Sequence, residues 1–228
     1  MGAGGIGMNK SNTTVSEKTI GRLSLYRRLL RALESDGVRH VFSHQLANMA
    51  GCTAAQLRRD LMEVGYSGSP ASGYEVTRLG QSISEFLDVP GGQRVVLVGV
   101  GNLGKALLLY FASRQTSLQV VAAFDSDPYK VNRVIHGCRC FPMESMLDVL
   151  KGQSQAVAII AVPVAAAQGA ADLLTQAGVR GMLNFAPVRL RVSPAVYVED
   201  IDMTIALEKV AYFARQGGGR VHGRGGLG

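Results

Sequence analysis

The sequence has little from which to build a disulfide framework, a metal centre or a membrane anchor. It contains three cysteines and four histidines among 228 residues, and three cysteines do not make the framework of a small secreted domain. No apolar run reaches the roughly 18 residues of a membrane span. No leader with a charged start, an apolar stretch and small residues opens the chain. We therefore expect a cytoplasmic protein without a membrane partner.

Charge of one sign is not concentrated either. The formal net charge is +7, and the excess of basic residues is spread along the chain. This balance permits a polyanionic partner without requiring one. Apolar residues make up 47% of the chain, which is ample for a core, and the length suits one large or two small domains.

The segment HGCRC at 136–140 brings histidine and cysteine together. Cys138 and Cys140 alternate along an expected short strand, and His136 alone does not complete a four-ligand zinc set. We expect a structural role for both thiols and no metal site. Whether they add thiol-based sensing is left open by the sequence.

The stretch from Arg94 to Pro128, RVVLVGVGNLGKALLLYFASRQTSLQVVAAFDSDP, is the most informative part of the chain. It has the pattern of a buried strand, a Gly-x-Gly-x-x-Gly turn, a helix and a second strand that ends in an acid. Such a glycine pattern is a strong signal only in this context. The alternative, a glycine turn in a fold without a ligand, fits the acid less well.

Each glycine of this turn has a separate structural role. Gly99 allows a sharp turn off the strand, Gly101 allows backbone to approach a pyrophosphate, and Gly104 allows the helix to pack close to the sheet. Asp125 lies where it can accept from both ribose hydroxyls, and its charge favours NAD(H) over NADP(H). The start of the helix would bind the phosphates. The candidate cofactor-binding residues here are Gly99, Val100, Gly101, Asn102, Leu103, Gly104, Lys105 and Asp125.

Residues 17–89 are expected to form a small helical domain. After a first helix that ends near Gly37, a short helix follows Ser43, with Leu46, Ala47 and Met49 facing inward. A Gly51–Thr53 turn leads into a third helix, in which Thr53 and Gln56 have the spacing of a capping box. This is the helix-turn-helix arrangement. The alternative is a helical dimerisation or lid domain.

The remaining segments complete a two-domain chain. Residues 66–75 have the composition of a wing, and a fourth helix carries Val76, Leu79, Ile83 and Phe86 inward. Residues 90–202 alternate strands and helices, which predicts a Rossmann-type doubly wound parallel sheet. The fold class is thus α/β with an N-terminal all-α winged-helix domain. A last helix, 203–215, has no obvious place on the sheet and is expected to pack on another subunit. Residues 1–16 and 216–228 are glycine-rich and are expected to be disordered tails.

The chain resembles the Rex family of bacterial repressors that sense the NADH/NAD⁺ ratio. The resemblance is carried by RLSLYRRLL, QLRRDL, VGVGNLGKAL, AAFDSDPYKV, IIAVPVAAAQGAADLLTQAGVRGMLNFAP and VEDIDMT. It implies a homodimer with swapped C-terminal helices, which binds palindromic operator DNA and is released by NADH. It also implies that the nicotinamide site contains Tyr110, Val162, Pro163, Asn184, Phe185 and, from the partner subunit, Met203.

Two further sets of residues follow from this resemblance. A switch is expected in which Asp202 of one subunit pairs with Arg28 of the other in the closed state, while oxidised cofactor draws Tyr110 or Asp202 to other partners. Without the resemblance, Arg28 would be a solvated helix-face cation and Tyr110 a core aromatic. The expected DNA-binding residues are Arg27, Ser43, Thr53, Gln56, Arg58 and Arg59.

The sequence departs from this family where DNA contacts are expected. Met62-Glu63-Val64 replaces a serine-tyrosine-phenylalanine run, and Ser69–Tyr74 replaces a basic wing. The operator sequence therefore stays open. Two other functions compete: a small NAD-dependent oxidoreductase, and a repressor that responds to another nucleotide such as CoA. The oxidoreductase lacks a second catalytic domain, and its histidines lie away from the expected strand ends, so we expect no enzyme activity.

Overall fold

The computed structural model describes residues 15–69, 72–113, 117–152 and 156–216. The chain divides into two compact units, Met1–Val89 and Pro90–Gly228. The predicted tails lie almost wholly outside the described residues. Ser16, which the prediction placed at the end of a disordered tail, instead caps the first helix, because its hydroxyl accepts from the Thr19 N–H at 3.2 Å.

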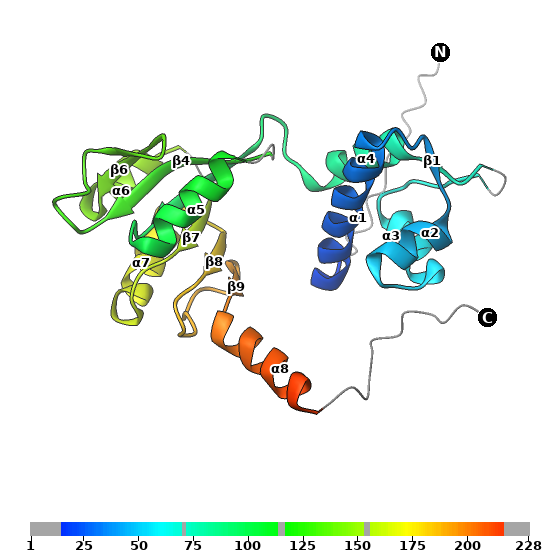
Figure 1. Ribbon diagram of the computed structural model, residues 1–228. Coiled ribbons are helices and arrows are strands. Elements are labelled where there is room, and N and C mark those ends of the chain that lie inside the picture. The colour runs from blue at the N-terminus through cyan, green and yellow to red at the C-terminus, as the bar shows by residue number, and fades with distance from the viewer. Residues whose placement is uncertain (1–14, 70–71, 114–116, 153–155, 217–228) are drawn as a thin grey trace, which may run out of the picture. The chain divides into compact units, whose positions relative to one another are not determined.

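The described residues of the first unit form four helices and a two-stranded ribbon, which Figure 1 shows. Strands β1 and β2 pair antiparallel, with Val41 opposite Tyr74. Its elements are α1 (Glu17–Ser35), β1 (His40–Val41), α2 (Ser43–Ala50), α3 (Ala54–Glu63), β2 (Tyr74–Glu75) and α4 (Val76–Leu87).

Two glycines end helices in this unit as the sequence indicates. Gly37 has φ +75° and follows α1, and the Val38 N–H returns to the Leu33 carbonyl at 2.9 Å. Gly51 has φ +67° and ends α2. The left-handed backbone conformation at this position costs glycine little free energy, because glycine has no Cβ. The turn between α2 and α3 is therefore short, as predicted.

Three details of the predicted packing in this unit were wrong. Met49 and Phe86 are exposed, because α2 and α4 bury narrower faces than the apolar pattern indicated. The capping box at α3 is only half formed. The Thr53 hydroxyl accepts from the Gln56 N–H at 3.1 Å, but the Gln56 amide donates to Asp60 at 2.9 Å instead of turning back to Thr53.

The second unit contains a seven-stranded sheet in the order β5-β6-β4-β3-β7-β8-β9. All neighbouring strands are parallel except β5 and β6, which form an antiparallel edge. The strands are β3 (Gln93–Val98), β4 (Leu118–Asp125), β5 (Val134–Ile135), β6 (Cys138–Pro142), β7 (Val157–Ile160), β8 (Gly181–Asn184) and β9 (Tyr197–Asp200). The helices are α5 (Asn102–Ala112), η1 (Met143–Ser145), α6 (Met146–Leu150), α7 (Val164–Gln176) and α8 (Met203–Arg215).

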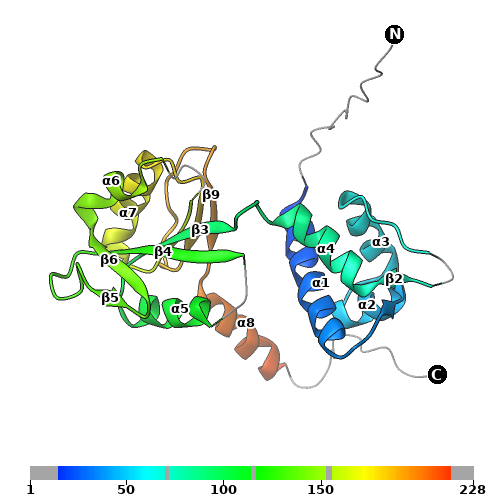
Figure 2. The same cartoon turned by 90° about the horizontal axis from the view of Figure 1, so that it is seen from above.

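Helices cover both faces of this sheet, which confirms the predicted doubly wound architecture. Figure 2 shows α5 on one side of the strands and α6 and α7 on the other. Alternate residues of β3 serve the two sides: Val95 and Leu97 lie in the core beneath α5, and Val96 and Val98 in the core beneath α7. The continuous apolar run VVLV, residues 95–98, is therefore buried on both faces, as is typical of parallel strands.

The chain order reverses between β3 and β7. Both strands are parallel and adjacent, but the chain leaves β3 toward β4 on one side and leaves β7 toward β8 on the other. A crevice opens at the carboxyl ends of two strands that diverge in this way, and ligands of open α/β sheets bind there. The glycine turn lies at this position.

Helix α8 contains no buried residue within this chain. It follows β9 and stands off the sheet (Figure 1). Its exposed large apolar side chains are Met203, Ile205, Leu207, Val210, Tyr212 and Phe213.

Candidate nucleotide site and nucleic-acid interface

The glycine turn has the conformation that the sequence predicts. Gly99 has φ +95°, and a Cβ there would collide with the Ala161 carbonyl oxygen. A Cβ on Gly104 would overlap the Gly99 oxygen, so α5 approaches the turn as closely as backbone allows. Gly101 differs, because a Cβ there would meet no atom within 4 Å. Its lack of a side chain serves no contact within the described chain and leaves room for a ligand.

The turn leads directly into α5, which begins at Asn102 with Gly101 as its N-cap. The Lys105 N–H donates to the Gly101 carbonyl at 2.9 Å and is the first amide to be bonded inside the helix. The preceding amides have no partner within the helix, and they carry its positive partial charge. The amides of Gly101, Asn102, Leu103 and Gly104 are therefore available to bind an anion, and Lys105, the next residue, has an exposed side chain.

The Asp125 carboxylate has more partners within the chain than the sequence indicated. Its carboxylate accepts from the Val100 N–H at 2.7 Å and from the Asp127 N–H at 2.9 Å, and Lys130 Nζ lies 3.3 Å away. A carboxylate has about four acceptor positions. One of these is not used in this structure, so binding of both ribose hydroxyls, as the sequence predicts, would require one of the three donors to move. Val100, whose side chain is buried and whose amide is used, offers only its carbonyl.

Lys130 places a positive charge beside Asp125. Its ammonium also lies 3.2 Å from Asp127. Burial would lower the pKa of Lys130, but the hydrogen bonds to Asp127 and Asp125 hold it above its usual value. The cation therefore stays charged and offsets the negative field that was expected to repel a 2′-phosphate. Sequence reasoning missed Lys130, although its position five residues after the strand-end acid was a usable signal.

The residues expected at the nicotinamide end come from the loops after β7 and β8. Val162 and Pro163 follow β7, and Phe185 follows β8, at the same edge as the glycine turn. Asn184 behaves differently. It is 0% exposed, and its amide donates to the Ala186 and Val188 carbonyls and to Asp200. Its side-chain carbonyl accepts from the Ala186 N–H at 3.0 Å, so both polar atoms of its side chain are bonded within the chain, and they shape this loop and join β8 to β9.

The other residues of the expected nicotinamide and switch sets lie on helices. Tyr110 is exposed on α5, eight residues and therefore about 12 Å along the axis from Asn102, with its ring edge-on to Phe111. Met203 opens α8 and is exposed. Asp202 is the N-cap of α8, and its carboxylate accepts from the Thr204 and Ile205 amides at 2.8 and 3.1 Å. Arg28 is exposed on α1, in the other unit.

In the first unit, α3 presents a polar face opposite its buried one. Leu57, Asp60 and Leu61 are buried. At 100° per residue, Arg59 projects from the opposite side and Arg58 from the flank. Arg58 Nη1 donates to Ser43 Oγ at 3.1 Å. The structure thus brings two predicted DNA-binding residues together at the start of α2 and along α3.

The remaining predicted DNA-binding residues have internal partners. Arg27 forms an ion pair with Asp88 at 2.7 Å, and Gln56 is bonded to Asp60. Thr53 is exposed at the N-cap of α3. In the predicted wing, Ser69 and Gly73 form an antiparallel bridge, while residues 70–71 lie outside the described part. Met62 and Glu63, two of the atypical residues, are exposed at the end of α3.

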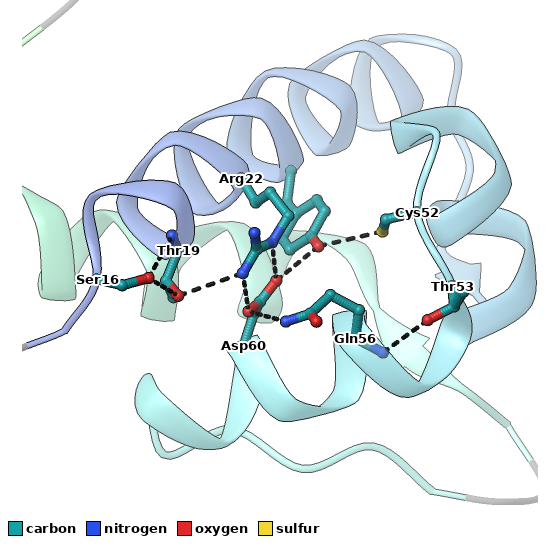
Figure 3. A network of polar contacts seen from close by, with 8 residues as sticks. Ser16, Thr19, Arg22, Cys52, Thr53, Gln56 and Asp60 are labelled. Atoms are coloured by element: carbon teal, nitrogen blue, oxygen red, sulfur yellow. Dashed lines mark hydrogen bonds and ion pairs between the residues drawn. The ribbon is translucent and has the colours of Figure 1, made fainter. Parts of the chain in front are cut away.

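No pattern in the sequence predicted the polar network that underlies α3 (Figure 3). Arg22 donates two hydrogen bonds to the Asp60 carboxylate, from Nε at 2.6 Å and from Nη2 at 2.7 Å. The Tyr26 hydroxyl donates to the same carboxylate at 2.8 Å and lies 3.3 Å from the Cys52 sulfur. Burial alone would raise the pKa of Asp60, but the hydrogen bonds from Arg22, Gln56 and Tyr26 hold it below its usual value.

Cys138 and Cys140 alternate along β6 as predicted, and both are buried. Burial raises the pKa of the Cys138 thiol to about 11 and, to a smaller extent, that of Cys140. Both therefore stay in the unreactive thiol form near neutral pH. Among the described residues, no group of three His, Cys, Asp or Glu side chains is placed to hold a metal. No helix in that part of the chain has the length and apolarity to cross a bilayer.

These features define a dinucleotide-binding α/β unit that is joined to a helix-turn-helix unit. Two family models agree with this division. One, described as a CoA binding domain, matches residues 92–188. The other, described as the N-terminus of a putative DNA-binding protein, matches residues 14–61.

Similarity to known proteins extends over most of the chain. It is 37% identical to the redox-sensing transcriptional repressor Rex of Carboxydothermus hydrogenoformans, over 89% of this chain and 97% of that protein. It is 39% identical to the protein of the same name from a Roseiflexus species, over 85% of this chain and 88% of the relative. The chain belongs to the Rex family of redox-sensing transcriptional repressors.

Solved structures of a Rex-family repressor, RSP, have the same fold. RSP in complex with NAD⁺ and operator DNA aligns with a TM-score of 0.82 at 30% identity, over 90% of this chain and 94% of RSP. RSP in complex with NADH aligns with a TM-score of 0.78 at 28% identity, over 90% of this chain and 96% of RSP.

Proposed function

We propose that this protein is a transcriptional repressor that binds operator DNA when NADH is scarce and leaves it when NADH binds. The observation that carries the proposal is the pairing of an anion-binding glycine turn in one unit with an arginine-bearing α3 in the other. RSP, which shares both units, was solved with NAD⁺ and operator DNA and also with NADH. The cofactors of this chain are accordingly NADH and NAD⁺, and its place of action is the cytoplasm, where the operator is.

The nucleotide lies across the carboxyl ends of β3 and β7. The free amides at the start of α5 bind the pyrophosphate, and Lys105 adds a positive charge. The single acceptor position left on Asp125, together with Asp127, serves the ribose. Toward the other end of the crevice, Val162 and Pro163, which follow β7, and Phe185, which follows β8, are apolar residues that would contact the nicotinamide ring.

Discrimination between the redox forms follows from this apolar surface. Oxidised nicotinamide carries a positive charge, and removing that charge from water costs free energy that the neutral dihydro ring does not lose. A preference of about 3 kcal/mol would favour NADH about a hundredfold, within the usual range of allosteric coupling. No proton relay is needed for this, and we propose that the protein is not an enzyme.

The functional form is a homodimer through α8. Six large apolar side chains of this helix are exposed in the single chain, and such a surface marks an interaction site. A second copy of α8 or of the sheet unit covers it. Met203 then reaches the partner's nicotinamide site. Because subunits related by a two-fold axis present two α3 helices, the operator is palindromic, with half-sites separated by whole helical turns.

The switch couples the two sites through Arg28, Tyr110 and Asp202. In the NADH-bound state, Asp202 of one subunit pairs with Arg28 of the other, which closes the dimer and moves the two α3 helices out of register with the operator. Asp202 also caps α8. A change in its partners therefore acts directly on the start of the dimerisation helix.

The experiment starts with selection of binding sites from random duplex DNA by the full-length protein, with and without NADH. The selected duplex is then titrated in a fluorescence anisotropy assay. We expect palindromic sites, release by NADH, and at least tenfold weaker release by NAD⁺. Equal release by both redox forms, or no sequence preference in the selection, would refute the proposal.

CoA is a second candidate effector, because residues 92–188 match a family model described as a CoA binding domain. The anion site at the start of α5 would accept the pyrophosphate of either nucleotide. Competition decides between them: if CoA displaces NADH from the free protein at equal or lower concentration and also releases the operator, CoA is the effector. Steady oxidation of NADH with a panel of hydroxy acids would revive the oxidoreductase alternative.

A further inference from the structure

The first unit keeps one carboxylate in its interior. Asp60 is 1% exposed, and four donors on three other side chains surround its two oxygens. Arg22 supplies two of them, Tyr26 one and Gln56 one. Arg22 is held in turn by Thr19, whose hydroxyl contacts the α1 cap residue Ser16. The first two turns of α1 are therefore connected by continuous polar contacts to the last turns of α3 (Figure 3).

Stability alone does not explain this arrangement. A buried ion pair contributes little net stability, because the loss of hydration offsets the attraction, and apolar residues of similar size often stabilise a fold as well or better. The neighbours Leu57 and Leu61 already bury the same face of α3 in apolar core. What a two-nitrogen arginine–carboxylate contact adds is direction, because both bonds are satisfied in only one relative orientation.

We propose that Arg22, Tyr26 and Asp60 are positioning residues for operator reading, which fix the rotation of α3 about its axis. The proposal rests on the proposed function. Arg58 and Arg59 lie within two positions of Asp60 on the same helix. With side chains about 5–6 Å from the axis, a rotation of 20° would move them by about 2 Å. Reading of base edges tolerates only about 0.5 Å.

Contacts to phosphates respond differently. They depend on net charge and on flexible side chains, and they contribute affinity without sequence information. A rotated α3 that keeps its arginines should therefore still bind DNA without sequence preference. The expected signature of a lost network is a reduced preference for the operator, with unchanged non-specific affinity and an unchanged dependence of affinity on salt.

The test uses the full-length protein in which the network is replaced by apolar residues, Arg22→Met, Tyr26→Phe and Asp60→Leu. Thr77→Val is the matched control, because the Thr77 hydroxyl donates to Glu34 at 2.8 Å and joins α1 to α4 without touching α3. Affinity for the selected operator and for a scrambled duplex is measured by anisotropy at several salt concentrations, and folding by thermal unfolding. We expect the operator preference to fall about ten- to hundredfold, the worth of one bidentate arginine–guanine contact, and the control to match wild type.

Two outcomes would overturn the inference: a folded triple variant with the wild-type operator preference, or one that loses both duplexes equally. If the triple variant does not fold, two single variants replace it. Arg22→Lys keeps the positive charge but loses the two-nitrogen contact with Asp60, and Tyr26→Phe removes one hydrogen-bond donor. Each should lose part of the preference, and retention of the full preference by both would equally overturn it. A wild-type protein with no operator preference would instead refute the proposed function.

Discussion

The substitution Gly101→Ala adds a single methyl group, and it should weaken nucleotide binding while leaving folding almost unchanged. The backbone of Gly101 has φ −75°, which alanine adopts freely, and the added Cβ meets no atom within 4 Å. Alanine is a poorer helix cap than glycine, but it reduces the freedom of the unfolded chain by about 0.4–1 kcal/mol. These effects oppose each other, so we expect the free energy of unfolding to change by less than about 1 kcal/mol.

The effect on NADH should be much larger. The methyl group occupies the space through which a pyrophosphate approaches the free amides at the start of α5. Loss of one hydrogen bond to a charged group costs about 1.5–3 kcal/mol, which corresponds to about ten- to hundredfold weaker binding. Calorimetric titration with NADH measures this, and the NADH concentration needed to release the operator should rise by the same factor.

Two other glycines serve as controls. Gly169→Ala lies in α7, where a Cβ also meets no atom within 4 Å, and should stabilise the fold by about 1 kcal/mol without an effect on NADH. Gly104→Ala would overlap the Gly99 oxygen and should damage folding and binding together. If Gly101→Ala folds normally and binds NADH within twofold of wild type, the pyrophosphate does not lie on this amide.

Three further perturbations test other parts of the structure. Asp202→Asn keeps the cap of α8, since asparagine caps as well as aspartate, but it removes the charge that pairs with Arg28. NADH should therefore still bind, while NADH no longer releases the operator. Unchanged release in a gel-shift titration would contradict the switch. Leu207→Asp places a charge in the uncovered apolar face of α8 and should turn the dimer into monomers in sedimentation, and a stable dimer would show that α8 is not the interface. The pKa of Asp60 is lower in the folded protein than its usual 3.8, so the stability it contributes is present at neutral pH and is lost as the pH falls below about 3.8. Thermal unfolding between pH 3 and 7 should therefore show a steeper acid loss for wild type than for Asp60→Leu, and parallel curves would refute the assignment.

Periodic and local signals in the sequence predicted most of the fold. The βαβ unit, the short turn between α2 and α3, the strands after residues 156 and 181 and the uncovered last helix all follow from apolar spacing and from glycines with a fixed geometric task. These signals act over a few residues, so a sequence window contains them. Gly99 and Gly104 could be assigned correctly because their roles depend on backbone contacts that recur wherever a strand turns tightly into a helix.

Side-chain partners that are far apart in sequence could not be predicted in this way. Arg22 and Asp60 are 38 residues apart, and each alone resembles a surface charge. Asn184 is the last residue of β8, where a ligand contact was expected, but its partners lie in the loop beyond it and on β9. Asp125 was placed correctly at the end of β4, while its donor Val100, 25 residues away, became visible only in the folded structure.

The shielded thiols of β6 have a consequence for what the protein reports. Cellular oxidants such as peroxides act on exposed, ionised cysteines, and Cys138 and Cys140 are neither. The nucleotide unit should thus follow the balance of reduced and oxidised dinucleotide while remaining indifferent to an oxidative burst. A cell would then receive two separate messages, one about its supply of respiratory electrons and another, from different proteins, about chemical damage.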